Sequence, residues 1–373
     1  MKLKEIAKVQ GGFAFKSDSF VSNETPIIRI GNIVNNEIVI DYDITAPIST
    51  IGDRKEFLVS KNDLLIAMSG ATVGKVGIYN FDIPSMLNQR VGNIKSDEGY
   101  KKYIFYLLQS PQFKKYVELS SIGCAQPNIS NSQIENFEFK ENSIDEIKKI
   151  VKKLDNVNSL IDIRKNEIEK CNNLIKSQFV EMFENNKYEK IRLGDYINTV
   201  SGGTPSKVHN EYYENGNIPW LTSGEVNNGV INEVKNYITE LGLKNSSAKL
   251  VPANSVVIAM YGATAGVVGL LKIKTSTNQA VCSLLPNDNF DPLFLYYAVK
   301  TNKEWMISQC KGGGQQNISQ SIIRNMMIIK APIELQNKFA EFVKQIDKQK
   351  FEFEKQLKKL EELQASLMQE YFG

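Results

Sequence analysis

The sequence predicts an α+β protein: two mixed α/β domains joined by two long antiparallel coiled-coil helices, in a pseudo-twofold internal repeat. Three observations predict this class. The chain has 373 residues, which is too long for one ordinary core. Its two halves match in sequence, and each half ends in a stretch with coiled-coil periodicity. Its composition, 42% hydrophobic and 23% charged, is that of an ordinary globular protein.

The repeat is clearest in one short segment. IAMSGATVGKVGI at residues 66–78 matches IAMYGATAGVVGL at residues 258–270 in nine of thirteen positions, at an offset of 192 residues. Shorter matches keep the same order while the offset drifts only between 189 and 192, so we interpret the chain as a tandem duplication. The shorter matches include LNQRV (87–91) with TNQAV (277–281), and QPNIS (126–130) with QQNIS (315–319).

Each repeat begins with a mixed segment. Short apolar runs at residues 63–68 and 255–260, bounded by glycine turns, predict buried strands. Helices are expected at residues 100–109 and 292–309, and Ser110-Pro111 should end the first of them.

Each repeat ends in a long helix. Apolar residues recur at steps of three and four over residues 147–182 and again, in the same phase, over residues 336–371. Ser143 and Glu146 fit a capping box at the start of the first helix, and Pro332 marks the start of the second. The residues expected to form the helix–helix seam are Ile147, Leu154, Val157, Ile161, Ile168, Phe339, Val343, Ile346, Phe353, Leu357 and Leu360.

Such a helix is not stable alone and needs an apolar partner for its seam. We expect the two long helices to pack antiparallel on each other; the alternative is that each packs on its own mixed domain. The boundaries that follow are residues 1–140 and 189–332 for the mixed domains, with residues 141–188 and 333–373 for the long helices.

The composition argues against most enzyme chemistry. With one histidine, His209, and no CxxC spacing, neither a metal site nor a catalytic residue is expected. The chain lacks an apolar run long enough for a membrane span and a signal-peptide pattern at its start, so a cytoplasmic protein without a membrane partner is expected. Buried free thiols are favoured for the four cysteines, Cys124, Cys171, Cys282 and Cys310.

The GATVGK segment at residues 70–75 resembles a phosphate loop but has too few residues between its glycines. It predicts instead a tight strand–turn–strand in which glycine adopts positive φ. Polar residues on such a turn are suited to contact DNA phosphates or base edges. The net charge of +3 allows nucleic-acid binding without indicating it.

Residues that differ between the repeats are the better candidates for reading a base. The Asn88-Gln89 and Asn278-Gln279 pairs recur in both copies and favour a structural hydrogen-bonding element or a shared phosphate contact, whereas Arg90 is replaced by Ala280. Asn128 is expected to be a turn or cap residue ahead of the next strand. The full set of candidate DNA-binding residues is Lys16, Ser69, Thr72, Lys75, Arg90, Thr204, Lys207, Tyr261, Thr264, Lys311 and Gln315.

The duplicated order of these motifs resembles the specificity subunit of type I restriction-modification systems. IELQNKFAEFVKQID from Ile333 and IDEIKKIVKKLDNVNSLID from Ile144 are similar to the two conserved helical regions of that family. SGGTPS at residues 201–206, with IPWLTSGEV after it, is similar to the start of many second target recognition domains. The first half departs from this pattern, having GGFAFKS and RIGNI at those places.

The resemblance implies that each mixed domain is a target recognition domain for one half of a bipartite, asymmetric double-stranded DNA site. The helices would set the gap between the halves and dock two methyltransferase subunits, and two motor and nuclease subunits would complete the complex. The chain itself would have no active site and no cofactor; S-adenosylmethionine would serve the methyltransferase, and ATP with Mg the motor. The alternative function is a non-catalytic scaffold whose two repeated domains bind proteins.

Overall fold

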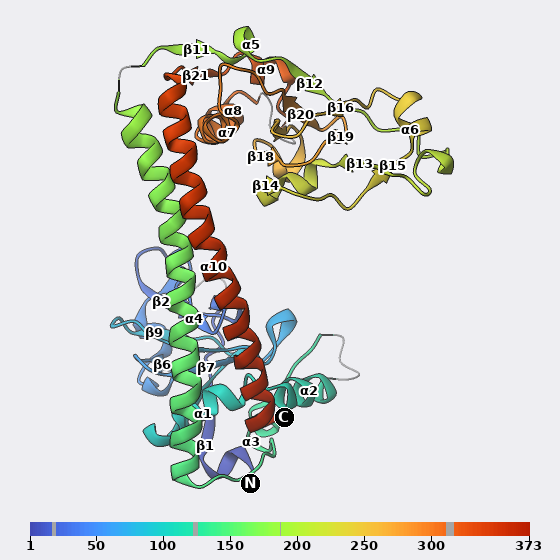
Figure 1. Cartoon of the computed structure of the whole chain (residues 1–373). Coiled ribbons are helices and arrows are strands. Elements are labelled where there is room, and N and C mark those ends of the chain that lie inside the picture. Colours follow the sequence, from blue (N-terminus) through green and yellow to red (C-terminus); the bar gives the residue numbers. More distant parts are fainter. Residues whose placement is uncertain (17–19, 122–125, 187, 311–316) are drawn as a thin grey trace. The chain divides into compact units, whose positions relative to one another are not determined.

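The computed structural model describes residues 1–16, 20–121, 126–186, 188–310 and 317–373. It has the predicted fold class, with strands and short helices in the mixed segments and two long helices, α4 and α10 (Figure 1). None of the helices in these ranges is long and apolar enough to cross a membrane.

The chain divides into two compact units. The first comprises residues 1–165 and 355–373, and the second comprises residues 166–354. The cut therefore passes through both long helices, so each helix contributes residues to both units. This division follows packing contacts and not the order of the elements along the chain. The four domain boundaries predicted from the sequence therefore stay a prediction.

In the first unit the mixed segment forms a larger and a smaller sheet. The larger has the strand order β1-β10-β7-β8-β4-β3 and the smaller the order β5-β2-β9-β6. The bounds are β1 Ala7–Gly11, β2 Thr25–Ile28, β3 Ile33–Val34, β4 Glu37–Ile38, β5 Thr45–Ala46, β6 Leu58–Val59, β7 Leu64–Ala67, β8 Val76–Ile78, β9 Ser85–Leu87 and β10 Val91–Ser96.

The second unit repeats this topology. Its sheets have the orders β12-β20-β17-β18-β14 and β15-β13-β19-β16, and the β13–β19 pair is parallel like β2–β9. This agreement in pairing and direction confirms the internal repeat. The bounds are β12 Thr199–Ser201, β13 Ile218–Leu221, β14 Val230–Ile231, β15 Tyr237–Ile238, β16 Leu250–Val251, β17 Val256–Ala259, β18 Val268–Leu271, β19 Thr275–Thr277 and β20 Val281–Leu284.

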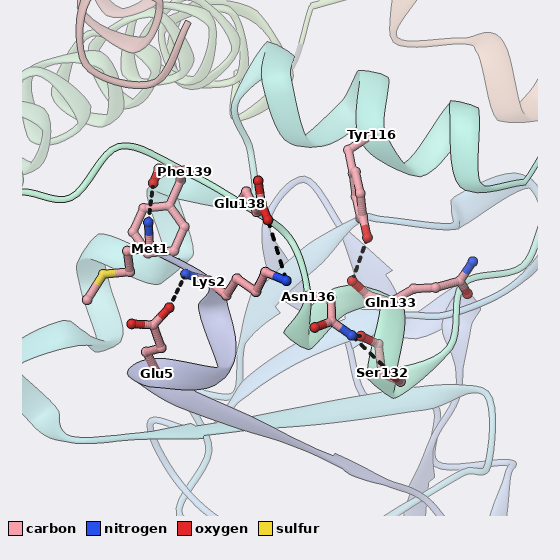
Figure 2. A network of polar contacts seen from close by, with 9 residues as sticks. All are labelled: Met1, Lys2, Glu5, Tyr116, Ser132, Gln133, Asn136, Glu138 and Phe139. Carbon is pink, nitrogen blue, oxygen red and sulfur yellow. Dashed lines mark hydrogen bonds and ion pairs between the residues drawn. The ribbon is translucent and has the colours of Figure 1, made fainter.

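Each mixed segment also pairs its first residues with the residues that lead into the following long helix. In the second unit the pair is β11 (Lys190–Arg192) with β21 (Met327–Ile329). In the first unit the Met1 amino nitrogen donates to the carbonyl of Phe139 at 3.2 Å, and Lys2 lies 3.5 Å from the Glu138 carboxylate (Figure 2). Tyr116 of α2 (Pro111–Ser120) donates to the Gln133 carbonyl of α3 (Asn131–Glu135), which joins these two short helices (Figure 2).

The short helices agree with the sequence in part. Helix α1 (Glu98–Leu107) is where one was predicted, and Ser110 caps the next helix, α2 (Pro111–Ser120), by accepting from the Phe113 amide. The single helix predicted over 292–309 is wrong, because α7 (Pro292–Lys300) ends before α8 (Lys303–Ser308) begins. Asn302 donates its side-chain amide to the Ala298 carbonyl at 2.8 Å, which satisfies the end of α7.

A second correction concerns the segment after Asn128. A short helix, not a strand, follows it, because Ser130 accepts from the Gln133 amide and so acts as an N-cap. The remaining helices lie at α3 Asn131–Glu135, α5 Leu193–Tyr196, α6 Glu240–Lys244, α7 Pro292–Lys300, α8 Lys303–Ser308 and α9 Gln320–Arg324.

Helix α4 spans Ile144–Phe179 and continues as a π-helical turn, Val180–Glu184, while α10 spans Ile333–Phe372. The predicted capping box is present: the Glu146 amide donates to Ser143 Oγ, and Ser143 donates its amide and hydroxyl to the Glu146 carboxylate. These hydrogen bonds lower the pKa of Glu146.

In the first unit the two long helices run antiparallel. Lys153 donates to the Tyr371 hydroxyl at 3.0 Å and Gln364 donates to the Asn158 amide oxygen, so residue numbers fall on α10 as they rise on α4. The α4 residues Ile147, Ile150 and Leu154 also join the core of the mixed domain. Both packing modes considered from the sequence are therefore present.

The second unit follows the same plan. Lys350 donates to the Asn172 amide oxygen at 2.8 Å, and the rings of Phe179 and Phe339 lie 5.5 Å apart, again in antiparallel order. Phe183 packs on Phe294 of α7 with ring centroids 4.7 Å apart. The ends of both helices are therefore part of a domain core, which fixes them to it.

The expected seam residues differ in burial along the helices. Those nearest the mixed domains are buried, whereas those further along are half-buried. The buried ones are Ile147, Leu154, Val157, Ile161, Phe339, Val343 and Ile346; the half-buried ones are Ile168, Phe353, Leu357 and Leu360.

Candidate nucleic-acid interface

The GAT segment forms the turn between two antiparallel strands in each unit. In the first it joins β7 to β8, with Gly70 and Gly74 at φ of 76° and 81°; in the second, Gly262 and Gly266 adopt φ of 75° and 76°. Positive φ is accessible to glycine without the steric penalty that a Cβ brings. The predicted role of these glycines is confirmed.

Replacing Gly74 with alanine is expected to destabilise the first unit by about 1–3 kcal/mol. The cause is the positive φ together with a new Cβ only 3.3 Å from a methyl group of Val117. Thermal unfolding followed by circular dichroism measures the change. Gly99→Ala is the matched control, since its Cβ would meet nothing within 4 Å and it lies in a helix. Equal melting of the two variants would contradict the strain argument.

The NIS segment, at residues 128–130 and 317–319, pairs with the residues just before this turn. In the first unit the Ile129 amide donates to the Met68 carbonyl at 2.9 Å, and Ser69 forms an isolated antiparallel β-bridge with Asn128. In the second unit the Ile318 amide donates to the Met260 carbonyl at 2.8 Å, and Tyr261 forms the same kind of β-bridge with Asn317.

The Asn-Gln turn meets the same residue from the other side. The Met68 amide donates to the Arg90 carbonyl at 2.9 Å, and the amide of Arg90 donates to Asn88 Oδ1 at 3.3 Å. The second unit repeats the turn, with Ala280 donating to Asn278 Oδ1 at 3.2 Å. Both asparagines therefore have the structural role expected from their recurrence.

The three motifs are brought together at one place in each unit, although they lie far apart in sequence. In the first unit they surround an open depression of about 690 Å³. Its lining is made of Met68, Ser69, Gln89, Arg90 and residues 126–132.

Of the first-unit candidates, Ser69 and Arg90 line the depression, whereas Lys16, Thr72 and Lys75 do not. Lys75 and Arg90 are exposed, as is Lys16 on another loop. Thr72 is half-buried, with its hydroxyl 3.5 Å from the Ile30 carbonyl. Ser69 is buried, and its Oγ has no hydrogen-bond partner among the described residues.

The second-unit candidates also differ in their contacts and exposure. The Thr204 hydroxyl donates to the Gln279 amide oxygen, and the Thr264 hydroxyl lies 3.4 Å from the Tyr261 carbonyl oxygen. Lys207 is exposed. Tyr261 exposes 40% of its surface. Lys311 and Gln315 lie outside the described residues.

The loop that carries Thr204 is anchored by its backbone. The Trp220 indole donates to the Gly203 carbonyl at 3.1 Å, and the Gly203 amide donates to the Thr277 carbonyl at 2.9 Å. The Tyr213 hydroxyl donates to the Pro205 carbonyl. The corresponding loop of the first unit is tied by the Phe13 amide, which donates to the Leu87 carbonyl at 2.7 Å.

Asn88 and Gln89, which the sequence presents as one pair, have different environments in the structure. Asn88 closes the turn, whereas Gln89 is exposed at the depression. The signal available in the sequence was the replacement next to it, Arg90 against Ala280, which marks the point where the two copies diverge.

Groups suited to covalent or metal chemistry do not gather here. No cluster of three or more His, Cys, Asp or Glu side chains suited to a metal occurs within the described ranges. Burial raises the pKa of the Cys282 thiol to about 12, so it stays protonated and unreactive. His209 is exposed and lies 3.1 Å from Glu211.

The geometry defines a class of protein: a duplicated chain in which the GAT turn, the Asn-Gln turn and the NIS segment meet in the same way in each unit. We call this meeting point, around Met68 and Met260, the platform. A family model described as "Type I restriction modification DNA specificity domain" matches residues 1–173 and 185–364. The chain belongs to this family of type I restriction enzyme specificity subunits.

Relatives agree over most of the chain. The specificity subunit of the Escherichia coli enzyme EcoR124I/EcoR124II is 24% identical over 330 residues, covering 83% of this chain and 80% of that one. The MjaIX specificity subunit of Methanocaldococcus jannaschii is 24% identical over 397 aligned residues, covering 98% and 90%. The crystal structure of the M. genitalium S subunit matches with a TM-score of 0.58 at 16% identity, covering 100% and 95%, and so shares the fold.

Proposed function

We propose that each mixed domain binds one half of a bipartite, asymmetric site in double-stranded DNA, and that α4 and α10 fix the gap between the halves. The observation that carries this proposal is the repeated platform. The same three motifs meet through the same backbone hydrogen bonds in both units, while the exposed side chains around them differ. A common frame with different side chains is suited to two related ligands of different sequence.

The long helices suit the spacing role because each contributes to the cores of both units. Two weakly binding domains held at a fixed distance combine their affinities, since the second binding event becomes intramolecular. The helices also offer the surface on which two methyltransferase subunits dock. Those subunits would use S-adenosylmethionine, and two motor and nuclease subunits would use ATP with Mg.

The test is selection from a randomised duplex library by the full chain together with its methyltransferase subunits. We expect enrichment of two short sequences separated by a gap of constant length. Binding to the selected duplex should weaken steeply with salt, by a power of the salt concentration close to the number of phosphates contacted. Equal binding to selected and random duplexes would contradict the proposal, and binding to neither would favour the protein scaffold instead.

A further inference from the structure

The depression in the first unit is bordered by polar side chains with no partner among the described residues. Gln89, Arg90 and Gln126 are exposed there, and none of their side chains makes a hydrogen bond or ion pair to the described part of the chain. Together they offer a guanidinium and two amides to a ligand that enters the depression.

Arg90 extends from a fixed point of the backbone. Its carbonyl accepts from the Met68 amide at 2.9 Å, and its own amide donates to Asn88 Oδ1 at 3.3 Å. The Asn88 backbone amide in turn donates to the Ile28 carbonyl at 3.0 Å, which joins the turn to β2 of the smaller sheet. A side chain that starts from a rigid turn loses less entropy on binding than one on a mobile loop.

The second unit supplies an internal comparison. Its turn has the same backbone bonds, but Ala280 replaces Arg90 and is buried. Gln279, the counterpart of Gln89, already accepts a hydrogen bond from Thr204. The second platform therefore lacks both the guanidinium and the unpaired glutamine at this place.

We propose that the first mixed domain reads a guanine with Arg90, through the paired acceptors O6 and N7 on the major-groove edge of a G·C pair. The inference rests on the proposed function and adds to it a base and a residue. The guanidinium of arginine has two parallel N–H groups that match these two acceptors, whereas the glutamine amide matches adenine N6 and N7. Gln89 and Gln126 line the depression together with Arg90, so we expect them to contact the neighbouring base pair. The second mixed domain cannot make the same contact, which makes the two half-sites different at this position.

The test compares the wild-type chain with Arg90→Ala and Arg90→Lys, each with its methyltransferase subunits, in competition binding. The competitors are selected duplexes in which every position is changed in turn. We expect Arg90→Ala to lose an about 5- to 150-fold preference for G·C at one position of one half-site, with the other half-site and the gap unchanged. Arg90→Lys keeps the charge and removes the paired N–H donors, so it should retain most of the overall affinity but a smaller preference for G·C than the wild type.

Lys115→Ala, an exposed charge on α2 of the same domain, controls for loss of one positive charge. It should leave the base preferences unchanged. The proposal is overturned if both Arg90 variants keep every base preference of the wild type, even if they bind more weakly throughout, because that marks a phosphate contact. A wild-type chain that selects no two-part sequence refutes the proposed function itself, which is a different outcome.

Discussion

Inserting one heptad into both long helices is expected to lengthen the preferred gap by about three base pairs. Seven residues add about 10 Å of helix, and B-DNA rises about 3.4 Å per base pair. The insertions belong between Lys165 and Asn166 in α4 and between Glu354 and Lys355 in α10, where each helix passes from one compact unit to the other. Both half-site sequences should be retained, because no residue of either platform changes.

Affinity for the original spacing should fall by roughly 100-fold or more, since the second domain then no longer gains from being tethered. Selection from a library with a variable gap measures both effects. The same seven residues added after Gly373 lengthen the chain outside the paired segment and should leave the gap unchanged. An unaltered gap in the doubly inserted chain would rule out α4 and α10 as the spacing element.

A heptad is the appropriate length because of the contacts between the helices. The Asn158–Gln364 hydrogen bond is a half-buried polar contact beside a mostly apolar seam, whereas the Asn172–Lys350 hydrogen bond is exposed. A half-buried polar contact of this kind favours one register, since a shifted register leaves a polar group facing apolar side chains. Seven residues in each helix nearly restore the facing of both helices, whereas four would turn the seam away.

The sequence contains strong information about the repeat and about the long helices, because both depend on local periodicity. Period and order of the motifs predicted two copies of one topology, and the Ser143–Glu146 box predicted where α4 begins. The break between α7 and α8 was not predictable in the same way. It depends on Asn302 reaching the Ala298 carbonyl, and neither glycine nor proline marks it, whereas Pro111 marks the corresponding break in the first repeat.

The sequence predicted the motifs that form the candidate site, but not that they lie next to one another in the fold. Residues near 69, 90 and 128 meet because β10 pairs with β7 and the NIS segment docks on Met68. These pairings join residues distant along the chain, and single-strand patterns carry no information on which strands are neighbours. The different roles of Asn88, which closes the turn, and Gln89, which is exposed, likewise depend on the folded geometry of the turn.

The aromatic residues where α4, α7 and α10 meet provide the second large effect. Phe339 is fully buried and lies 5.5 Å from Phe179, 5.6 Å from Phe183 and 5.4 Å from Tyr297, measured between ring centroids. Phe339→Ala is therefore expected to destabilise the second unit by about 3–5 kcal/mol, from lost burial and the cavity left behind.

Both tryptophans of the chain, Trp220 and Trp305, belong to the second unit, so their fluorescence reports on its unfolding. The urea midpoint should fall by about 1–2 M. Phe351→Ala is the matched control, because Phe351 lies on the same helix but exposes 62% of its surface, and its midpoint should barely move. If the two variants unfold at the same urea concentration, the start of α10 does not contribute to the domain core. The helix would then be held only by its partner, and a rigid attachment of the recognition platform to the spacing helices would lose its physical basis.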